Sequence, residues 1–290
     1  MLFQQLINGI SVGGIYALIA SGYALIYSLL GFSNWAHGEV AMVGAYIAWL
    51  SMAMIKLPFP LALIFGIAGA ALLSVINERF FYRPIRERRS PAVFLMIAAM
   101  GLSIIFQNGS MLIFGAKFHR YEILLPITSI PIFGARIGAV DLASLIVSAI
   151  SLLALDTLIT KTKFGLGVRA IASNGRTASL LGINVDRIFM LVFMLAGMLA
   201  GLAGILLGFK YNVYPTMGNI GLKAFIASVF GGLGSVRGAI IGALTIGIIE
   251  SLVTGYWDSG LRDFITFALL IAILLIKPSG LMGINVEEKA

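Results

Sequence analysis

The stretch LINGISVGGIYALIASGYALIYS, residues 6–28, decides the class of fold. It contains no charged side chain, and it is long enough to cross a bilayer as a helix, which takes about 20 mainly apolar residues. Similar apolar windows follow along the chain, at residues 40–55, 61–76, 92–114, 142–159, 188–207, 239–253 and 264–276. The sequence therefore predicts an all-α, polytopic membrane protein with eight spans.

The composition agrees with a membrane protein. Hydrophobic residues make up 60% of the 290-residue chain and charged residues 11%, and the mean hydropathy is +1.02. Soluble domains carry about 25% charged residues, so this chain has too few polar side chains to cover a water-facing surface. This excludes an ordinary soluble enzyme. No interior linker is long enough to divide the chain, and residues 1–290 are predicted to form a single transmembrane domain.

The basic residues predict the orientation. The formal net charge is +8, and half of the 20 Lys and Arg residues lie in two loops, around residues 79–89 and 161–187. Because Lys and Arg collect in cytoplasmic loops and face anionic lipid, both loops are predicted to be cytoplasmic. Counting back along the spans places the N-terminus outside. No basic run is interleaved with stacking aromatic residues, so no nucleic-acid partner is expected.

Several kinds of chemistry are absent from the sequence. There is no cysteine, and the two histidines, His37 and His119, are too few and too far apart for a histidine-built metal site. There is also no G-x-x-x-x-G-K-[ST] loop, so the chain is not expected to hydrolyse nucleotide itself. We therefore expect no enzyme activity, no metal and no cofactor in this chain.

A polar stretch, GFSNWAHGE at residues 31–39, separates the first two apolar windows. A charged side chain at membrane depth costs about 2.5–3.5 kcal/mol on insertion scales, so it usually has a partner or lines a polar path. One interpretation is a broken helix in which Asn34, His37 and Glu39 line or brace a translocation path. The other is an ordinary interfacial turn, in which Glu39 lies near the lipid headgroups and caps the next helix. The sequence leaves both open.

The loop of residues 160–187 contains a predicted short helix. Asn174 is placed to cap its N-terminus, and Gly182 is placed to end it in a Schellman motif. Apolar residues at helical spacing predict a face that docks onto a cytoplasmic partner, and a helix lying in the lipid interface is the alternative. The residues predicted to form the docking site are Arg169, Ile171, Arg176, Ala178, Leu181 and Gly182.

A ninth apolar element, residues 222–230, is only about half a span long at 1.5 Å per residue. It leads directly into a glycine-rich turn, which is typical of a short or re-entrant helix. Gly231, Gly232 and Gly234 are predicted to pack tightly at a break between membrane elements. A phosphate cradle is disfavoured because no lysine follows at the required spacing.

Four stretches together resemble the permeases of branched-chain amino-acid ABC importers. The first is N-x-A-H-G-E at residues 34–39 with Met42, Gly44 and Tyr46, in which Trp35 departs from the Phe or Met of many relatives. The others are the loop 169–187, the stretch 230–235 with Gly238 and Gly242, and the segment KPSGL at 277–281. The resemblance runs in consistent order from about residue 6 to residue 283.

This resemblance implies a transporter subunit in the bacterial inner membrane. Such a permease pairs with a second, homologous permease, in a heterodimer. Two cytoplasmic ATP-binding subunits, which use ATP and Mg²⁺, bind the coupling loop, about residues 160–187. A periplasmic binding protein delivers leucine, isoleucine or valine, and the path opens alternately to each side. Urea and short-amide importer permeases are close relatives and stay an alternative.

A different class of protein, a proton- or ion-coupled secondary transporter, also stays open. It would use Glu39 and Glu250 as coupling carboxylates, but it would leave the docking helix without a role. Glu250 lies in the window 239–253, and its nearness to Tyr256 and Trp257 predicts that it lies at the membrane interface.

Overall fold

The computed structural model describes residues 2–121, 130–132 and 135–283, and nearly all of its regular structure is helical. The helices are α1 (Leu2–Leu30), α2 (His37–Ala53), α3 (Phe59–Ile76), the π-helix η1 (Asn77–Tyr82), α4 (Arg83–Glu87), α5 (Ala92–Phe114), α6 (Ala139–Lys161), α7 (Lys163–Leu180), α8 (Val185–Tyr211), the 3-10 helix η2 (Met217–Asn219), α9 (Ile220–Gly231), α10 (Val236–Tyr256) and α11 (Leu261–Ile276). Two short strands, β1 (Ile130–Ile132) and β2 (Ala135–Ile137), form an antiparallel pair that the sequence did not predict.

Six segments are long and apolar enough to cross a membrane. They are Leu2–Leu30, Phe59–Glu87, Ala92–Phe114, Ala139–Lys161, Val185–Tyr211 and Val236–Tyr256. The segment Phe59–Glu87 is longer than the predicted window because α3, η1 and α4 continue one another without a break. The other two predicted spans are helices of 17 and 16 residues, α2 and α11. Among the described residues the fold is thus a helical membrane bundle with six candidate spans.

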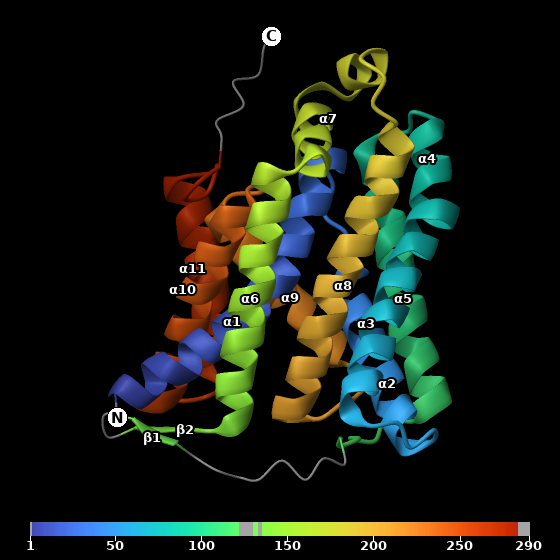
Figure 1. Cartoon of the computed structure of the whole chain (residues 1–290). Helices are drawn as coiled ribbons and strands as arrows, with labels where there is room; N and C mark the ends of the chain where they lie inside the picture. Colours follow the sequence, from blue (N-terminus) through green and yellow to red (C-terminus); the bar gives the residue numbers. More distant parts are fainter. Residues whose placement is uncertain (1, 122–129, 133–134, 284–290) are drawn as a thin grey trace.

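The two basic loops lie at the same end of the bundle. Figure 1 shows α4 and α7 at one end, and the N-terminus and the β1–β2 pair at the opposite end. The loops around residues 79–89 and 161–187 therefore share a side, as their charge predicts.

The central helices pack through small residues. A Cβ atom added to Gly247 of α10 would lie 2.5 Å from the Cα atom of Gly13 in α1, and one added to Gly201 of α8 would lie 2.6 Å from the Ala70 Cβ atom in α3. In lipid, helices associate through van der Waals contact, which requires such close approach of the backbones. The glycine content of the chain thus supports the α1–α10 and α3–α8 contacts.

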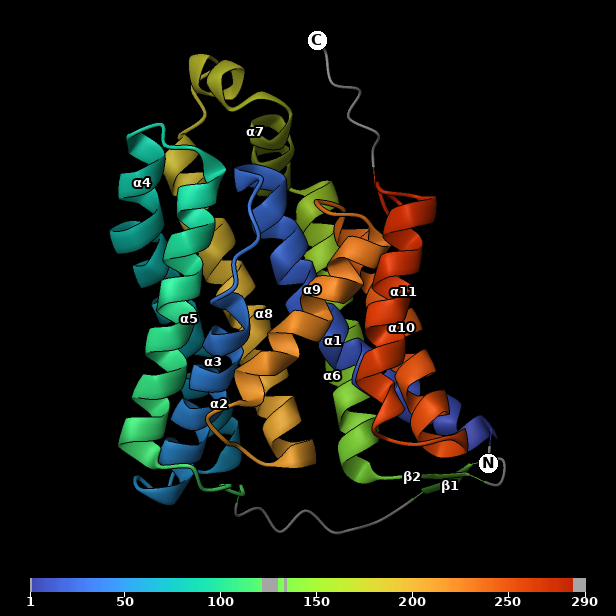
Figure 2. The same ribbon diagram turned by 180° about the vertical axis from the view of Figure 1, so that it is seen from behind.

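α2 and α9 each follow a non-helical stretch inside the bundle, so each is one half of an interrupted helix. Non-helical residues 31–36 precede α2, and residues 212–216 lead through η2 into α9. α2 packs on α8 and α3, while α9 packs on α1 and α10. The N-terminal ends of α2 and α9 meet in the interior of the bundle (Figure 2), where a Cβ atom on Gly221 would lie 2.6 Å from the Gly38 Cα atom.

Candidate functional site

The break between α1 and α2 begins at an exposed glycine, and buried residues alternate with more exposed ones along it. Gly31 adopts φ +63°, a left-handed conformation that favours glycine, and its N–H still donates to the Tyr27 carbonyl. The following residues Phe32, Asn34 and Ala36 are buried. Asn34 holds the break in two ways, because its carbonyl accepts from the His37 N–H at 3.0 Å and its side-chain oxygen accepts from the Tyr82 hydroxyl at 2.7 Å.

His37 and Glu39 stand in the first turn of α2, and both are enclosed. The His37 ring packs edge-on against Tyr23, with ring centroids 4.9 Å apart. The Glu39 side chain is only 3% exposed, and one of its oxygens accepts from the Ser103 hydroxyl at 3.3 Å. Both side chains are therefore enclosed by protein, and Glu39 lies in the first turn of α2, where a carboxylate that caps this helix would lie. The choice between a broken helix along a path and an interfacial turn stays a prediction.

Glu39 lies between two helix N-termini. It is part of the first turn of α2, and its carboxylate contacts Gly218 in η2, directly before α9. The N-terminus of a helix carries a partial positive charge, so a carboxylate between two such ends is favoured by both. The other carboxylate oxygen of Glu39 makes no hydrogen bond with any described residue. The structure thus brings Asn34, His37 and Glu39 together where the two interrupted helices meet.

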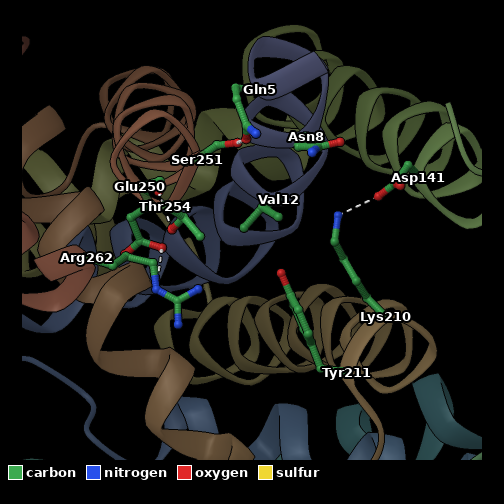
Figure 3. A pocket seen from close by; sticks show the side chains of 11 residues that line it. Gln5, Asn8, Val12, Asp141, Lys210, Tyr211, Glu250, Ser251, Thr254 and Arg262 are labelled. Atoms are coloured by element: carbon green, nitrogen blue, oxygen red, sulfur yellow. Dashed lines mark hydrogen bonds and ion pairs between the residues drawn. The ribbon is translucent and has the colours of Figure 1, made fainter. Parts of the chain in front are cut away.

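A second polar region is a cleft at the end of the bundle that holds the N-terminus. Its volume is about 230 Å³, and it lies among α1, α6, α8, α10 and α11. Figure 3 shows an ion pair at each side, Lys210 with Asp141 and Arg262 with Glu250. Gln5, Asn8 and Ser251 add neutral polar groups. Charged side chains that face a cavity inside a membrane bundle indicate a polar path.

Glu250 is enclosed by protein. It is 3% exposed, and its oxygens accept hydrogen bonds from the hydroxyls of Tyr16 and Thr266, each at 3.0 Å. The Lys223 ammonium group lies 2.9 Å away and also pairs with Asp263, at 2.7 Å. The neighbours that satisfy Glu250 come from α1, α9 and α11, far away in sequence, so the sequence did not predict them. Its position at the membrane interface stays a prediction.

Sequence reasoning missed the charged residues of this region. Lys223 stands inside the short apolar element, and Lys210 and Arg262 stand at helix ends beside apolar runs. A lone charge in an apolar window is a signal of a buried partner. Lys223 carries this signal as clearly as Glu39 and Glu250 do.

The loop helix is present with both predicted caps. α7 is kinked at Asn174, whose side-chain oxygen accepts from the Thr177 N–H at 2.9 Å. At the other end Gly182 adopts φ +84°, the Ile183 N–H donates to the Ala178 carbonyl and the Gly182 N–H donates to the Ser179 carbonyl. These two hydrogen bonds define a Schellman motif.

The apolar face of this helix differs from the prediction. Ile171 and Ala178 are buried against Phe189 of α8, so they do not face a partner. Leu180 and Leu181 are instead 82% and 77% exposed. The prediction extended one helical phase from Ile171 to Leu181, but the kink at Asn174 separates the two. The docking role itself stays a prediction.

The two arginines of the predicted docking site are exposed. Arg169 donates to the carbonyls of Ile159 and Thr160 at the end of α6, so it ties α7 to α6. Arg176 points outward from the second part of α7. The two arginines thus lie on opposite sides of the kink at Asn174.

The predicted glycine turn connects α9 to α10 by close backbone contacts. Gly232 adopts φ +114° and Gly234 φ +82°. A Cβ atom on Gly231 would collide with the Gly238 carbonyl. The Leu281 and Met282 N–H groups donate to the carbonyls of Phe230 and Gly231, so the segment after α11 also closes on this turn.

No metal centre is built from the residues that the structure describes, since they contain no cluster of three or more His, Asp or Glu side chains able to hold an ion. The arrangement has a different character. Two interrupted helices meet end to end inside a membrane bundle, and charged pairs line a nearby cleft. This combination defines a multi-pass membrane transport protein.

The comparisons with known proteins agree with this class. The family described as "Branched-chain amino acid transport system / permease component" matches residues 5–274. The chain is 37% identical to the high-affinity branched-chain amino acid transport system permease protein LivH of Salmonella typhimurium, over 99% of this chain and 97% of that one. It is 35% identical to the corresponding protein BraD of Pseudomonas aeruginosa, with the same coverage. The chain belongs to this permease family.

A solved structure has a similar fold. It is that of PsaBC from Streptococcus pneumoniae in complex with Fab, with a TM-score of 0.50 over 94% of this chain and 91% of that one. The sequence identity is 13%, so the similarity concerns the fold alone.

Proposed function

We propose that this chain is a permease subunit of an ATP-driven, binding-protein-dependent importer that carries branched-chain amino acids across the inner membrane of a bacterium. The observation that carries the proposal is the 37% identity, over 99% of the chain, to a protein named as a permease of high-affinity branched-chain amino acid transport. The chain itself is not an enzyme in this scheme. ATP and Mg²⁺ are used by partner subunits.

The proposed complex contains a second, homologous permease, two cytoplasmic ATP-binding subunits and a periplasmic binding protein. Two features support the ATP-binding partners. The sequence has no phosphate-binding loop of its own, and α7 presents the exposed leucines Leu180 and Leu181 at the basic end of the bundle. Exposed leucines on a short helix that stands beyond the spans favour a protein partner.

All eight predicted helices are proposed to span the membrane, with α9 as the short element. The 16- and 17-residue helices α11 and α2 are near the lower limit of about 17 residues for a span, and the non-helical residues 31–36 add length to α2. Residues 1–290 then form one transmembrane domain, with residues 160–187 as its cytoplasmic coupling loop. The N-terminus faces the periplasm.

Asn34, His37 and Glu39 brace the path in this proposal rather than line it, because all three are buried within the subunit. Alternating access moves α2 and α9 relative to each other, and Glu39 lies at their junction. The close-packed turn at Gly231, Gly232 and Gly234 connects α9 to α10, so it transmits movement between them.

Uptake by the assembled transporter tests the proposed substrate. The two permeases, the ATP-binding subunits and the binding protein are reconstituted in proteoliposomes, with ATP inside and the binding protein outside. We expect uptake of radiolabelled leucine, isoleucine and valine, and none of urea or acetamide. Uptake of urea or acetamide without uptake of leucine would assign the chain to the amide importers instead.

A further inference from the structure

The guanidinium group of Arg262 has unused hydrogen-bond donors at the junction of two cavities. Its Nε atom is 4.0 Å from the nearest Glu250 oxygen and 3.9 Å from the nearest Asp263 oxygen, beyond hydrogen-bonding distance. That Nε atom is buried and has no hydrogen-bond partner among the described residues, while the side chain as a whole is 39% exposed. Because a buried donor without an acceptor is costly, this arginine can accept a further anionic group.

The larger of the two cavities has a volume of about 690 Å³ and lies between α9 and α11. The smaller is the cleft of Figure 3, and the two share Arg262 and Tyr211. The larger cavity has both charged and apolar lining, with Ile220, Leu222 and Phe267 among its apolar side chains. Its volume is within the range of about 300–1,000 Å³ that is typical of small-molecule sites.

Two cations, Lys223 and Arg262, balance two anions, Glu250 and Asp263, in this region. Arg262 and Asp263 each keep hydrogen-bonding capacity that no described residue takes up. Both oxygens of Glu250 are occupied, by Lys223, Tyr16 and Thr266. Asp263 is 63% exposed and pairs with Lys223 through one oxygen, while its other oxygen has no partner among the described residues. Arg262 thus offers unused donors beside the unused acceptor of Asp263. A cationic side chain with an available donor, beside an anionic side chain with an available acceptor, matches a zwitterionic ligand.

We propose that the cavity between α9 and α11 binds the transported α-amino acid on its way through the permease. Arg262 binds the α-carboxylate, for which a planar guanidinium is suited. Asp263 binds the α-ammonium group, and Ile220, Leu222 and Phe267 surround the aliphatic side chain. α9 begins at this cavity, so its N-terminal dipole also favours the carboxylate. This inference rests on the proposed function, because it takes an amino acid as the substrate.

Equilibrium binding to the purified complex of permeases and ATP-binding subunits, without the binding protein, tests the site. The probe is radiolabelled L-leucine, and the competitors are leucinamide, which lacks the carboxylate, and 4-methylpentanoate, which lacks the ammonium group. For the wild type we expect saturable binding that valine displaces and that neither analogue displaces. Arg262→Gln should weaken leucine binding at least about tenfold, since it removes charge-assisted hydrogen bonds.

The matched control is Arg136→Gln, since Arg136 is an exposed arginine of β2, a strand at the same end of the bundle (Figure 1), and lines neither cavity. Its leucine binding should equal that of the wild type. If the Arg262→Gln complex does not assemble, the Asp263→Asn complex is measured instead, and we expect the same loss of leucine affinity. Wild-type binding by an assembled Arg262→Gln complex, or no saturable wild-type binding up to millimolar leucine, would overturn the site. If the wild type still shows ATP-dependent leucine uptake with the binding protein, the proposed function survives that outcome. Absence of such uptake would contradict the proposed function itself.

Discussion

At the scale of single residues, Glu39 stands where the two interrupted helices meet. It is buried, it accepts one hydrogen bond from Ser103, and it contacts Gly218 at the start of the second interrupted helix. Its negative charge is placed to offset the partial positive charges of two helix N-termini. We therefore expect Glu39 to stabilise the position of α2 relative to α9.

The variant Glu39→Gln removes this charge and keeps the shape of the side chain. We expect ATP-dependent leucine uptake to fall at least about tenfold, because interaction with a helix end is worth up to about 2 kcal/mol in partly buried geometry. The yield and subunit ratio of the purified complex should stay normal, and both are measured together with uptake. Full uptake by a normally assembled variant would reduce Glu39 to a purely structural residue.

A substitution at Gly38 tests the backbone contact between α2 and α9 at the same junction. A Cβ atom on Gly38 would collide with the Gly218 carbonyl and lie 2.8 Å from the Gly221 Cα atom. Gly38→Ala should therefore lower the thermal stability of the detergent-solubilised complex, by about 1–3 kcal/mol for an overpacked interior. The control is Gly101→Ala in α5, where an added Cβ meets no atom within 4 Å. Equal melting temperatures for the two variants would contradict the close contact of α2 and α9.

At the scale of elements, the sequence predicted helices better than the contacts between them. Each apolar window is a helix, and the caps at Asn174 and Gly182 are where local chemistry places them, because a cap depends only on residues within a few positions. The apolar face of α7 was not predictable in the same way. It depends on a kink that changes the helical phase and on Phe189, which belongs to another helix.

The same limit explains the charged network around Glu250. Its partners come from α1, α9 and α11, and no local pattern connects residues 16, 223, 250 and 266. The meeting of α2 with α9 was also not predictable, although the sequence indicates both the interruption at residues 31–39 and the short element at 222–230. Periodicity gives the length of an element, but not which distant element it contacts.

The exposed end of α7 is predicted to be required for binding of the ATP-binding subunits. Leu181→Glu places a charge on the surface proposed to meet the ATP-binding subunits, so we expect those subunits no longer to co-purify with the permease. The control is Leu166→Glu, an exposed leucine on the same helix before the kink, which should leave co-purification unchanged. Normal recovery of the ATP-binding subunits with Leu181→Glu would reject this part of α7 as the docking surface.

At the scale of the whole molecule, the two ends of the bundle differ in charge and in proposed environment. The chain has no cysteine, so single cysteines can report which side of the membrane each end faces. Ser173→Cys in α7 should be protected from a membrane-impermeant maleimide in intact spheroplasts. Ser259→Cys, between α10 and α11 at the opposite end, should be labelled. Both should react after permeabilisation, and the reverse pattern in intact spheroplasts would invert the orientation.

The energy source tests the central claim, that this chain belongs to an ATP-driven importer, most directly. The measurement is the initial rate of leucine uptake into proteoliposomes that contain the complete complex, with the binding protein outside, with and without internal ATP and a protonophore. We predict uptake that requires ATP and the partner subunits and that is unchanged when the protonophore collapses the proton gradient. Gradient-driven uptake by this chain alone, abolished by the protonophore and independent of ATP, would contradict the account.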